Sequence, residues 1–254
     1  MTQSRHEAVV ERQFGAQANA YLNSAVHAQG EEFAQLRERL SASSGARVLD
    51  LGCGAGHVSF QVAPLAGEVV AYDLSEQMLA VVASAAAERG LDNIRTRQGV
   101  AERLPFEDCE FDFVFSRYSA HHWRDVGQAL REVRRVLKPG GVACFIDVAA
   151  PGLPLLDTHL QAVEVLRDTS HVRDYSPSEW ARLVGEAGLA VTACSRQRLR
   201  LEFTSWVERM RTPEVMRQAI RALQLSVGIE VREYFEIDAE GSFSTDVLVL
   251  WANK

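Results

Sequence analysis

The sequence predicts an α/β fold in which helices cover both faces of a seven-stranded, mostly parallel sheet. Two observations predict this fold class. Between about residues 46 and 150, short apolar segments alternate with segments of helical spacing, and parallel strands need such crossover helices, which then cover the sheet. The chain has 254 residues, of which 47% are hydrophobic, so it can bury a sizeable core.

Five strands and the helices between them are predicted in this first region. The strands cover residues 47–51, 68–73, 94–98, 111–116 and 142–147. The helices cover residues 58–65, 76–89 and 126–137. Gly90 ends the second of these helices and the Lys138-Pro-Gly-Gly segment ends the third, because glycine and proline interrupt helical structure.

The flanking regions predict a helical flap and a helical cap. Residues 6–40 show amphipathic helical spacing, and further helices are expected at 155–168, 177–185 and 205–225, the last broken near Pro213. Strands at 191–203 and 242–251 complete the sheet. We expect one domain, 1–254, with a flap (1–45), a core (46–150) and a C-terminal half (151–254) that carries a cap at about 204–228.

The bulk properties narrow the functional classes. A formal net charge of −7 argues against a nucleic-acid partner, because phosphates are usually met by a basic surface. No apolar run reaches the ~18 residues that span a bilayer, and the polar start is unlike a signal peptide, so we expect a cytoplasmic protein without membrane insertion. The four cysteines form no C-x-x-C pair, so no metal site is expected.

The strongest motif is Val48-Leu-Asp-Leu-Gly-Cys-Gly-Ala-Gly56, where a strand enters a glycine turn and a helix follows. Glycine lacks a Cβ, so the backbone of such a turn can approach a ligand closely. The dinucleotide fingerprint G-x-G-x-x-G would need a third glycine at His57, whereas the last glycine here comes one residue earlier. Asp50, before the turn, suits an amino group better than a pyrophosphate. The motif therefore disfavours an NAD-dependent oxidoreductase.

The end of the second strand supplies a further candidate. Asp73 follows the glycine turn by about 20 residues, where an acidic side chain can accept hydrogen bonds from both hydroxyls of a ribose. Leu74 and Met78 come directly after it and offer an apolar face for an adenine ring. The same two side chains fit an ordinary core equally well.

Four segments in order resemble the motifs of class I S-adenosyl-L-methionine (SAM)-dependent methyltransferases. They read VLDLGCGAG, AYDLSEQML, GVAERLPFEDCEFDFVFSRYSAHHW and REVRRVLKPGG, and they span roughly residues 46–150. Within this family the chain is most similar to the branch of quinone C-methyltransferases and YafE-like proteins. The resemblance implies a Rossmann-like fold, SAM as cofactor and S-adenosyl-L-homocysteine as product.

The resemblance also implies roles for individual residues. The turn would hold the methionine part of SAM through Gly52, Cys53, Gly54 and Gly56, with Asp50 directed to its ammonium group. Asp73 would bind the ribose, and Ala101 and Glu102 would line the adenine edge. Ser116 would lie beside the methionine group, which Tyr21 would approach from the flap. Many relatives have an aspartate before the Ala-Glu pair, and Val100 here cannot supply that side-chain hydrogen bond.

Candidates for the acceptor side follow the fourth and fifth strands. His121 or His122 is a candidate general base, since the pKa of histidine lies near neutrality. Two adjacent residues on a regular element point apart, so we expect only one of them to reach the acceptor. The other candidates come from the flap, from the loop after the fourth strand and from the segment before residue 177; they are Phe14, Arg117, Tyr118, Arg173 and Tyr175.

The leading functional hypothesis is methyl transfer from SAM to a small-molecule acceptor. The branch resemblance makes a quinone-like or hydroxylated aromatic compound the first acceptor to consider. A SAM-binding protein without methyl transfer, such as a regulator or a SAM-modifying enzyme, stays open as an alternative. A nucleic-acid methyltransferase is disfavoured by the net charge and by the lack of an Asn/Asp-Pro-Pro-Tyr-type motif. Both a monomer and a homodimer are compatible with the sequence.

Overall fold

A seven-stranded sheet forms the centre of the computed structural model, which describes residues 5–15, 22, 30–43 and 45–254. The strand order is β3-β2-β1-β4-β5-β7-β6. The strands are β1 (Arg47–Leu51), β2 (Glu68–Asp73), β3 (Ile94–Gln98), β4 (Phe111–Arg117), β5 (Leu137–Ala149), β6 (Ala190–Leu201) and β7 (Phe243–Asn253). Only β7 pairs antiparallel with its neighbours. The predicted mostly parallel, seven-stranded sheet is therefore confirmed.

Two hydrophobic clusters lie on opposite faces of this sheet. One contains side chains of α4 (Glu32–Ser41), α5 (His57–Val62) and α6 (Glu76–Glu88). The other contains side chains of α7 (Val126–Val136) and α9 (Pro177–Glu186). Alternate residues of one strand enter different clusters, as Val48 and Leu49 of β1 do. Both faces are therefore buried, as expected for parallel strands.

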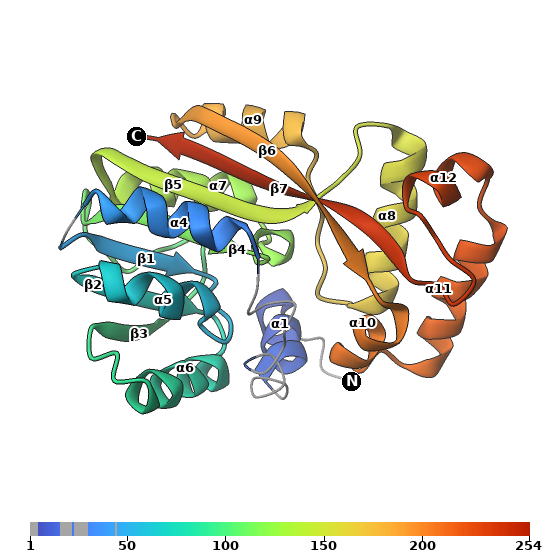
Figure 1. The fold of residues 1–254 in the computed structure, drawn as a ribbon, viewed down its shortest axis with the longest axis horizontal. Coiled ribbons are helices and arrows are strands. Elements are labelled where there is room, and N and C mark those ends of the chain that lie inside the picture. The colour runs from blue at the N-terminus through green and yellow to red at the C-terminus, as the bar shows by residue number, and fades with distance from the viewer. Residues whose placement is uncertain (1–4, 16–21, 23–29, 44) are drawn as a thin grey trace.

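A group of helices beside one end of the sheet forms the cap (Figure 1). It consists of α8 (Pro154–Arg167), α10 (Phe203–Arg209), α11 (Glu214–Ser226) and α12 (Ile229–Tyr234). The insert between β6 and β7 is longer than the predicted 204–228, because α12 follows α11 after the break at Gly228. The predicted break near Pro213 is present, since α10 ends at Arg209 and α11 begins after that proline. A third hydrophobic cluster joins the cap helices to each other.

The predicted flap (1–45) contains two described helices, α1 (His6–Gly15) and α4. α4 packs on the sheet, whereas α1 lies between the sheet region and the cap (Figure 1). His6 Nε2 lies 2.9 Å from the carbonyl oxygen of His122, after β4. Gln13 Nε2 donates to the carbonyl oxygen of Met210, after α10, also over 2.9 Å. This helix therefore contacts both sides of the space between sheet and cap. No helix in the described ranges is long and apolar enough to cross a lipid bilayer.

Two predicted element boundaries were wrong. The strand predicted at 142–147 begins at Leu137, where it already pairs with Phe111 of β4. The helix predicted at 58–65 ends at Val62 and continues as a 3₁₀ turn, Ala63–Leu65. Pro64 explains the second difference, because proline has no N–H for the next helical hydrogen bond.

Candidate active site

The glycine turn after β1 is built from three residues with left-handed backbone angles. Gly52, Gly54 and Gly56 have φ values of 71°, 50° and 85°. A Cβ on Gly52 would lie 1.9 Å from the Oγ atom of Ser119, so this position is also closed by packing. A Cβ on Gly54 would meet no described atom within 4 Å. The turn therefore leaves open space in front of Gly54, where a ligand can approach its backbone.

The carboxyl group of Asp73 is fixed beside this turn. One oxygen accepts a hydrogen bond from the backbone N–H of Gly54 over 2.8 Å. The other accepts from the N–H of Ser75, also over 2.8 Å. Burial raises the pKa of Asp73, and the hydrogen bonds to these two amides act in the opposite direction. The side chain is thus held at the end of β2 with little freedom to turn.

The space in front of the turn is a cavity of about 1130 Å³, part of which is open to solvent. It brings together most of the predicted cofactor residues; they are Asp50, Gly52, Cys53, Gly54, Asp73, Leu74, Met78, Ala101 and Glu102. Gly56 does not line it, and neither does Ser116, whose buried Oγ has no hydrogen-bond partner among the described residues. Ser119, three residues later in the chain, does line it. Tyr21 lies outside the described residues.

A second cavity adjoins the first on the side of the cap. It shares the side chains of Phe14, Tyr118 and His122 with the first cavity. Its other walls come from the ends of β5 and β6 and from α8 and α10, and include Val148, Leu199 and Trp206. A ligand here would therefore lie next to a ligand in the first cavity.

Both predicted histidines line the second cavity. That at most one of them reaches the acceptor stays a prediction. They lie on a 3₁₀ turn, Ala120–His122, where neighbouring side chains are about 120° apart rather than opposite. The centroids of the two rings are 4.1 Å apart.

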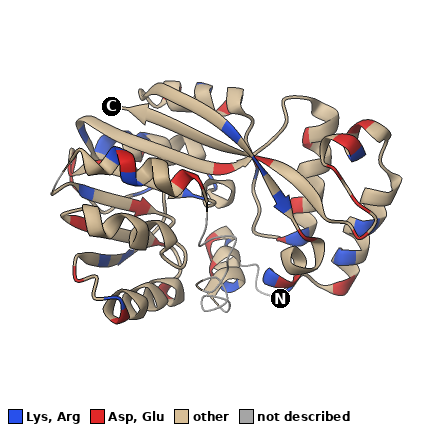
Figure 2. Ribbon diagram, in the orientation of Figure 1, with Lys and Arg blue, Asp and Glu red and all other residues tan. Residues whose placement is uncertain are grey.

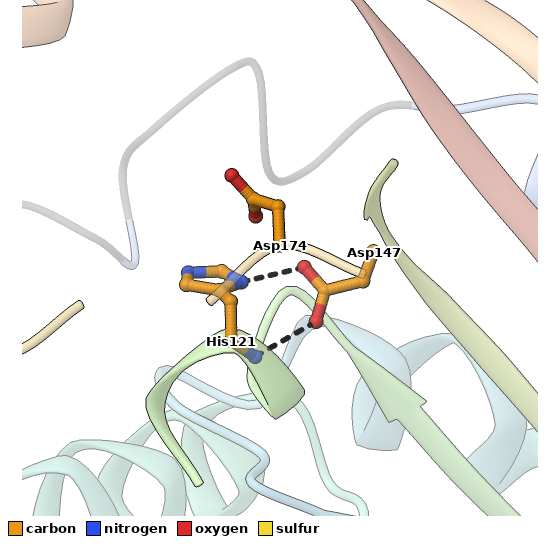
Figure 3. Close-up of side chains that lie close together, drawn as sticks. All are labelled: His121, Asp147 and Asp174. Carbon is orange, nitrogen blue, oxygen red and sulfur yellow. Dashed lines mark hydrogen bonds and ion pairs between the residues drawn. The ribbon is translucent and has the colours of Figure 1, made fainter. Parts of the chain in front are cut away.

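The two rings differ in protonation because their partners differ. His121 Nδ1 lies 2.6 Å from an oxygen of Asp147 (Figure 3). Burial lowers the pKa of His121, but the charge of Asp147 and the hydrogen bond to it outweigh this effect and raise the pKa to about 9. Burial and the neighbouring charge of His121 lower the pKa of His122 to about 3. At neutral pH His121 is therefore an imidazolium and His122 is neutral.

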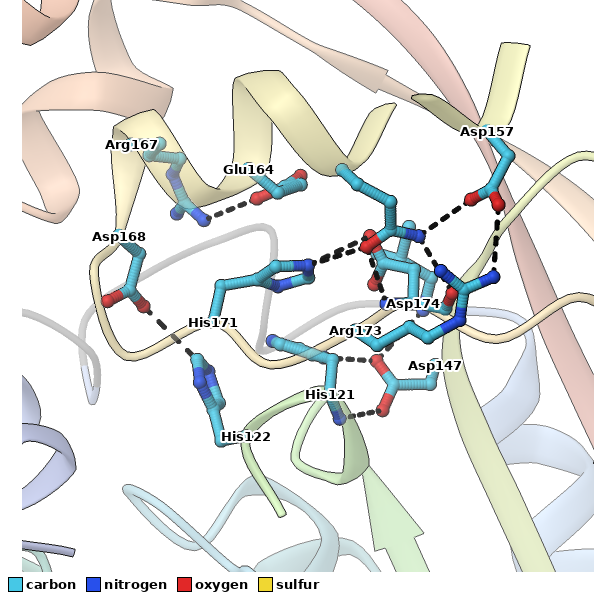
Figure 4. Close-up of polar contacts among 12 residues, drawn as sticks. His121, His122, Asp147, Asp157, Glu164, Arg167, Asp168, His171, Arg173 and Asp174 are labelled. Atoms are coloured by element: carbon cyan, nitrogen blue, oxygen red, sulfur yellow. Dashed lines mark hydrogen bonds and ion pairs between the residues drawn. The ribbon is translucent and has the colours of Figure 1, made fainter. Parts of the chain in front are cut away.

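A polar network surrounds these rings (Figure 4). His122 Nδ1 lies 3.1 Å from the carbonyl oxygen of Ser170, to which it donates in the neutral form. Asp174 is buried, and in the described part of the chain one of its oxygens has no hydrogen-bond partner. Burial raises the pKa of Asp174 well above its usual range, and the charge of Glu164 adds to this effect. His121, Asp147 and Asp174 each place one polar atom within 4.8 Å of the others (Figure 3).

The remaining acceptor candidates separate into two groups. Phe14 and Tyr118 line both cavities, and Arg117 lines the first, where its guanidinium pairs with the buried carboxylate of Glu32 over 2.8 Å. Arg173 and Tyr175 line neither cavity. The structure therefore does not bring these two residues to either cavity. Arg173 instead forms ion pairs with Asp157 and Glu179 at 3.0 and 3.1 Å, and Tyr175 packs edge-on against Trp180.

The comparisons with known proteins agree with this geometry. A family model described as a methyltransferase domain matches residues 49–145. The YafE protein of Escherichia coli (strain K12) is 55% identical over 203 residues, which cover 80% of this chain and 98% of YafE. The YcgJ methyltransferase of Bacillus subtilis (strain 168) is 39% identical over 203 residues, 80% of each chain. The chain belongs to the SAM-dependent methyltransferase family.

Structural and more distant matches lead to the same family. The crystal structure of YcgJ superimposes with a TM-score of 0.84 and 34% identity, over 89% of this chain and 99% of that one. A demethylmenaquinone methyltransferase of Chlorobaculum parvum is 33% identical over 121 residues, which cover 47% of this chain and 48% of that protein. The methyltransferase resemblance and the SAM cofactor predicted from the sequence motifs are therefore confirmed.

The residues of the first cavity fit SAM. The open space at Gly54 gives the backbone access that the methionine part of SAM requires. Asp50 is buried, and one of its oxygens accepts from the N–H and the Oγ–H of Ser59 over 2.9 and 2.6 Å. Burial raises its pKa to about 7. A buried carboxyl group of this kind would gain a counter-ion from the SAM ammonium group, while Asp73 would hold the ribose.

The raised pKa of Asp50 predicts that SAM binding releases a proton. Near pH 6 the carboxyl group is mostly protonated, and a cation beside it would favour the ionised form. SAM affinity should therefore increase as the pH rises from about 6 to about 7.5. Titration calorimetry in buffers of different ionisation enthalpy measures the proton released, and this release should disappear in Asp50→Asn. Equal proton release by both proteins would contradict the placement of the ammonium group.

Proposed function

We propose that this methyltransferase transfers the methyl group of SAM to a small acceptor molecule in the second cavity, and that the acceptor is a hydroxylated aromatic or quinone-like compound. The observation that carries the proposal is the shared wall of the two cavities. Phe14, Tyr118 and His122 contact both spaces, so donor and acceptor would lie side by side. Aromatic and aliphatic side chains, among them Trp206 and Leu199, provide an apolar surface for a ring.

The main tasks of the protein in methyl transfer would be to align the acceptor with SAM and to exclude water. SAM supplies a methyl group that is already activated by its sulfonium. The chain would align the acceptor and exclude water, and both effects lower the barrier for such a transfer. The two histidines are the titratable side chains on the 3₁₀ turn at the junction of the cavities. The demethylmenaquinone methyltransferases supply the reason to begin with quinone-like acceptors, although the matched segments span about half of each chain.

A small acceptor is favoured over a nucleic acid by the charge distribution. Acidic and basic residues are interspersed over the helices and strands (Figure 2). The arginines that alternate along β6 face acidic side chains: Arg198 lies 3.1 Å from Asp246, and Arg200 pairs with Asp238. These cations are already neutralised, so they would contribute little to binding phosphates. We infer that the enzyme acts on a diffusible small molecule in the cytoplasm.

The test is a product assay combined with a variant that fills the second cavity. Wild-type protein and SAM are incubated with hydroxynaphthoquinones, catechols, amines and thiols, and S-adenosylhomocysteine release is measured. Leu199→Trp should abolish methylation of the accepted compound and leave the Kd for SAM unchanged, because Leu199 lines only the second cavity. Leu225→Trp, at a position that is 66% exposed on the cap, is the matched control.

The outcomes separate the proposal from its alternative. Turnover of hydroxylated aromatic or quinone-like compounds that is lost in Leu199→Trp would support it. Tight SAM binding without turnover of any acceptor would favour a SAM-binding protein without methyl transfer. Turnover that survives in Leu199→Trp would place the acceptor elsewhere in the molecule.

A further inference from the structure

The carboxylate of Asp147, at the end of β5, is held so that it fixes the ring of His121. Its side chain is 3% exposed. One oxygen lies 2.6 Å from His121 Nδ1 and accepts from the N–H of Val148 over 2.9 Å. The other accepts from the backbone N–H of His121 over 3.3 Å. A carboxylate bound on both oxygens cannot rotate freely, so the direction of the imidazole ring is determined by β5.

This arrangement leaves the far side of the ring for a ligand. The Nδ1 atom is occupied by Asp147, and the Nε2 atom is on the opposite edge of the ring (Figure 3). Among the residues that the structure describes, none forms a hydrogen bond with Nε2. His121 lines the second cavity and keeps 16% of its side chain exposed. An imidazolium in this position can donate one charge-assisted hydrogen bond to a molecule in the cavity.

Charged groups of both signs surround His121. The groups that face it or line the same cavity come from the turn itself, β5, α8, the segment after α8 and α10; they are His122, Asp147, Glu164, Arg167, Asp168, His171, Asp174 and Arg209. Burial lowers the pKa of His122 and of His171, and burial with nearby acids raises the pKa of Asp174. Arg167 and Arg209 add two cations to that of His121, and Asp147, Glu164 and Asp168 supply three carboxyl groups. Selection of an anion therefore depends on the Nε2–H edge of the His121 ring and not on an excess of positive charge.

We propose that His121 Nε2–H binds an ionised oxygen of the acceptor, so that the enzyme selects acceptors with an acidic phenol- or enol-type hydroxyl group. This inference rests on the proposed function. It gives His121 the role of a hydrogen-bond donor to an acceptor that arrives as an anion, in place of the general base expected from the sequence. Asp147 is then a positioning residue that keeps the ring charged and directed into the cavity.

A pair of probes that differ in one ionisable group tests the inference. We would use 2-hydroxy-1,4-naphthoquinone, an acidic enol that is ionised at neutral pH, and its methyl ether. Their Kd values are measured by calorimetry at pH 7 with saturating S-adenosylhomocysteine. Wild-type protein should bind the anion about ten- to a hundredfold more tightly than the ether, as expected for a hydrogen bond between charged groups. His121→Gln and Asp147→Asn should reduce this preference to roughly threefold or less.

Two further measurements exclude a merely structural effect. Asp157→Asn removes a carboxylate that pairs with Arg173 outside the cavity lining, and it should keep the preference of the wild type. In the wild type the preference should persist up to about pH 9, the pKa of His121. In a folded Asp147→Asn protein the preference for the anionic probe should be lost at a lower pH, because the carboxylate that keeps His121 protonated is absent.

Equal binding of the two probes by the wild type, or tighter binding of the ether, would overturn the inference. So would turnover of amines or thiols with no binding of either probe, although methyl transfer itself would then stand. If the protein bound SAM but methylated none of the acceptors, the proposed function itself, on which the inference depends, would be contradicted.

Discussion

Replacing Asp73 by alanine should weaken SAM binding by at least about a hundredfold. The carboxylate would hold both ribose hydroxyls, and a hydrogen bond to a charged group contributes about 1.5–3 kcal/mol, so two such bonds contribute about 3–6 kcal/mol. The variant would also lose the hydrogen bonds that Asp73 accepts from Gly54 and Ser75, and with them the fixed position of the turn. Titration calorimetry with SAM and with S-adenosylhomocysteine measures the effect.

Two control variants make this result specific. Asp108→Ala removes a carboxylate whose side chain is 75% exposed, and it should leave the Kd unchanged. Asp73→Asn retains the shape and one acceptor oxygen and should fall between the wild type and the alanine variant. If a folded Asp73→Ala protein bound SAM as tightly as the wild type, Asp73 would not be the residue that binds the ribose.

Replacing Trp206 by alanine should lower the free energy of unfolding by about 3–5 kcal/mol. The indole ring is 2% exposed in the cap cluster. Its centroid lies 4.9 Å from the ring of Phe243 and 4.9 Å from the guanidinium carbon of Arg167. Alanine would leave a cavity between α10, α8 and the start of β7 that these rigid elements cannot close. Urea unfolding followed by circular dichroism measures the change.

The exposed side chain of Leu225 supplies the comparison. Leu225→Ala on the outer surface of α11 should change the free energy of unfolding by less than about 0.5 kcal/mol. If Trp206→Ala had an equally small effect, the cap would not be packed around this ring. Because Trp206 also lines the second cavity, acceptor turnover should fall in the variant even below its unfolding midpoint.

The fold and the cofactor site depend on signals that are local in the sequence. Residues 47–51, 68–73 and 94–98 were predicted with the boundaries that the structure shows, because each is a short segment bounded by turn residues. The glycine turn and Asp73 lie on adjacent strands, β1 and β2, whose carboxyl ends meet. Ligands of open parallel sheets bind at the carboxyl ends of the strands, and this rule was sufficient to place the glycine turn and Asp73 in one site.

The acceptor side depends on contacts between distant segments. Asp147 lies next to His121 only because β5 pairs with β4 in one particular register. Its position at the carboxyl end of the predicted fifth strand is the one sequence feature that places Asp147 near a site. Asp174 and Trp206 reach the same cavity from the segment after α8 and from α10. Sequence periodicity does not predict contacts between such distant segments. The helix α12 was missed for a different reason, because its six residues are too few to show a clear helical period.

The position of β7 has a consequence for how the protein is made. It pairs with β5 on one side and β6 on the other, and β6 has no other strand neighbour. During synthesis β1 to β4 can associate as soon as they emerge, whereas β6 must wait for residues 243–253. Until then β5 and β6 present unpaired edges, which are the usual starting points of aggregation. The nascent chain is therefore most in need of a chaperone in the interval between the translation of residue 201 and that of residue 253.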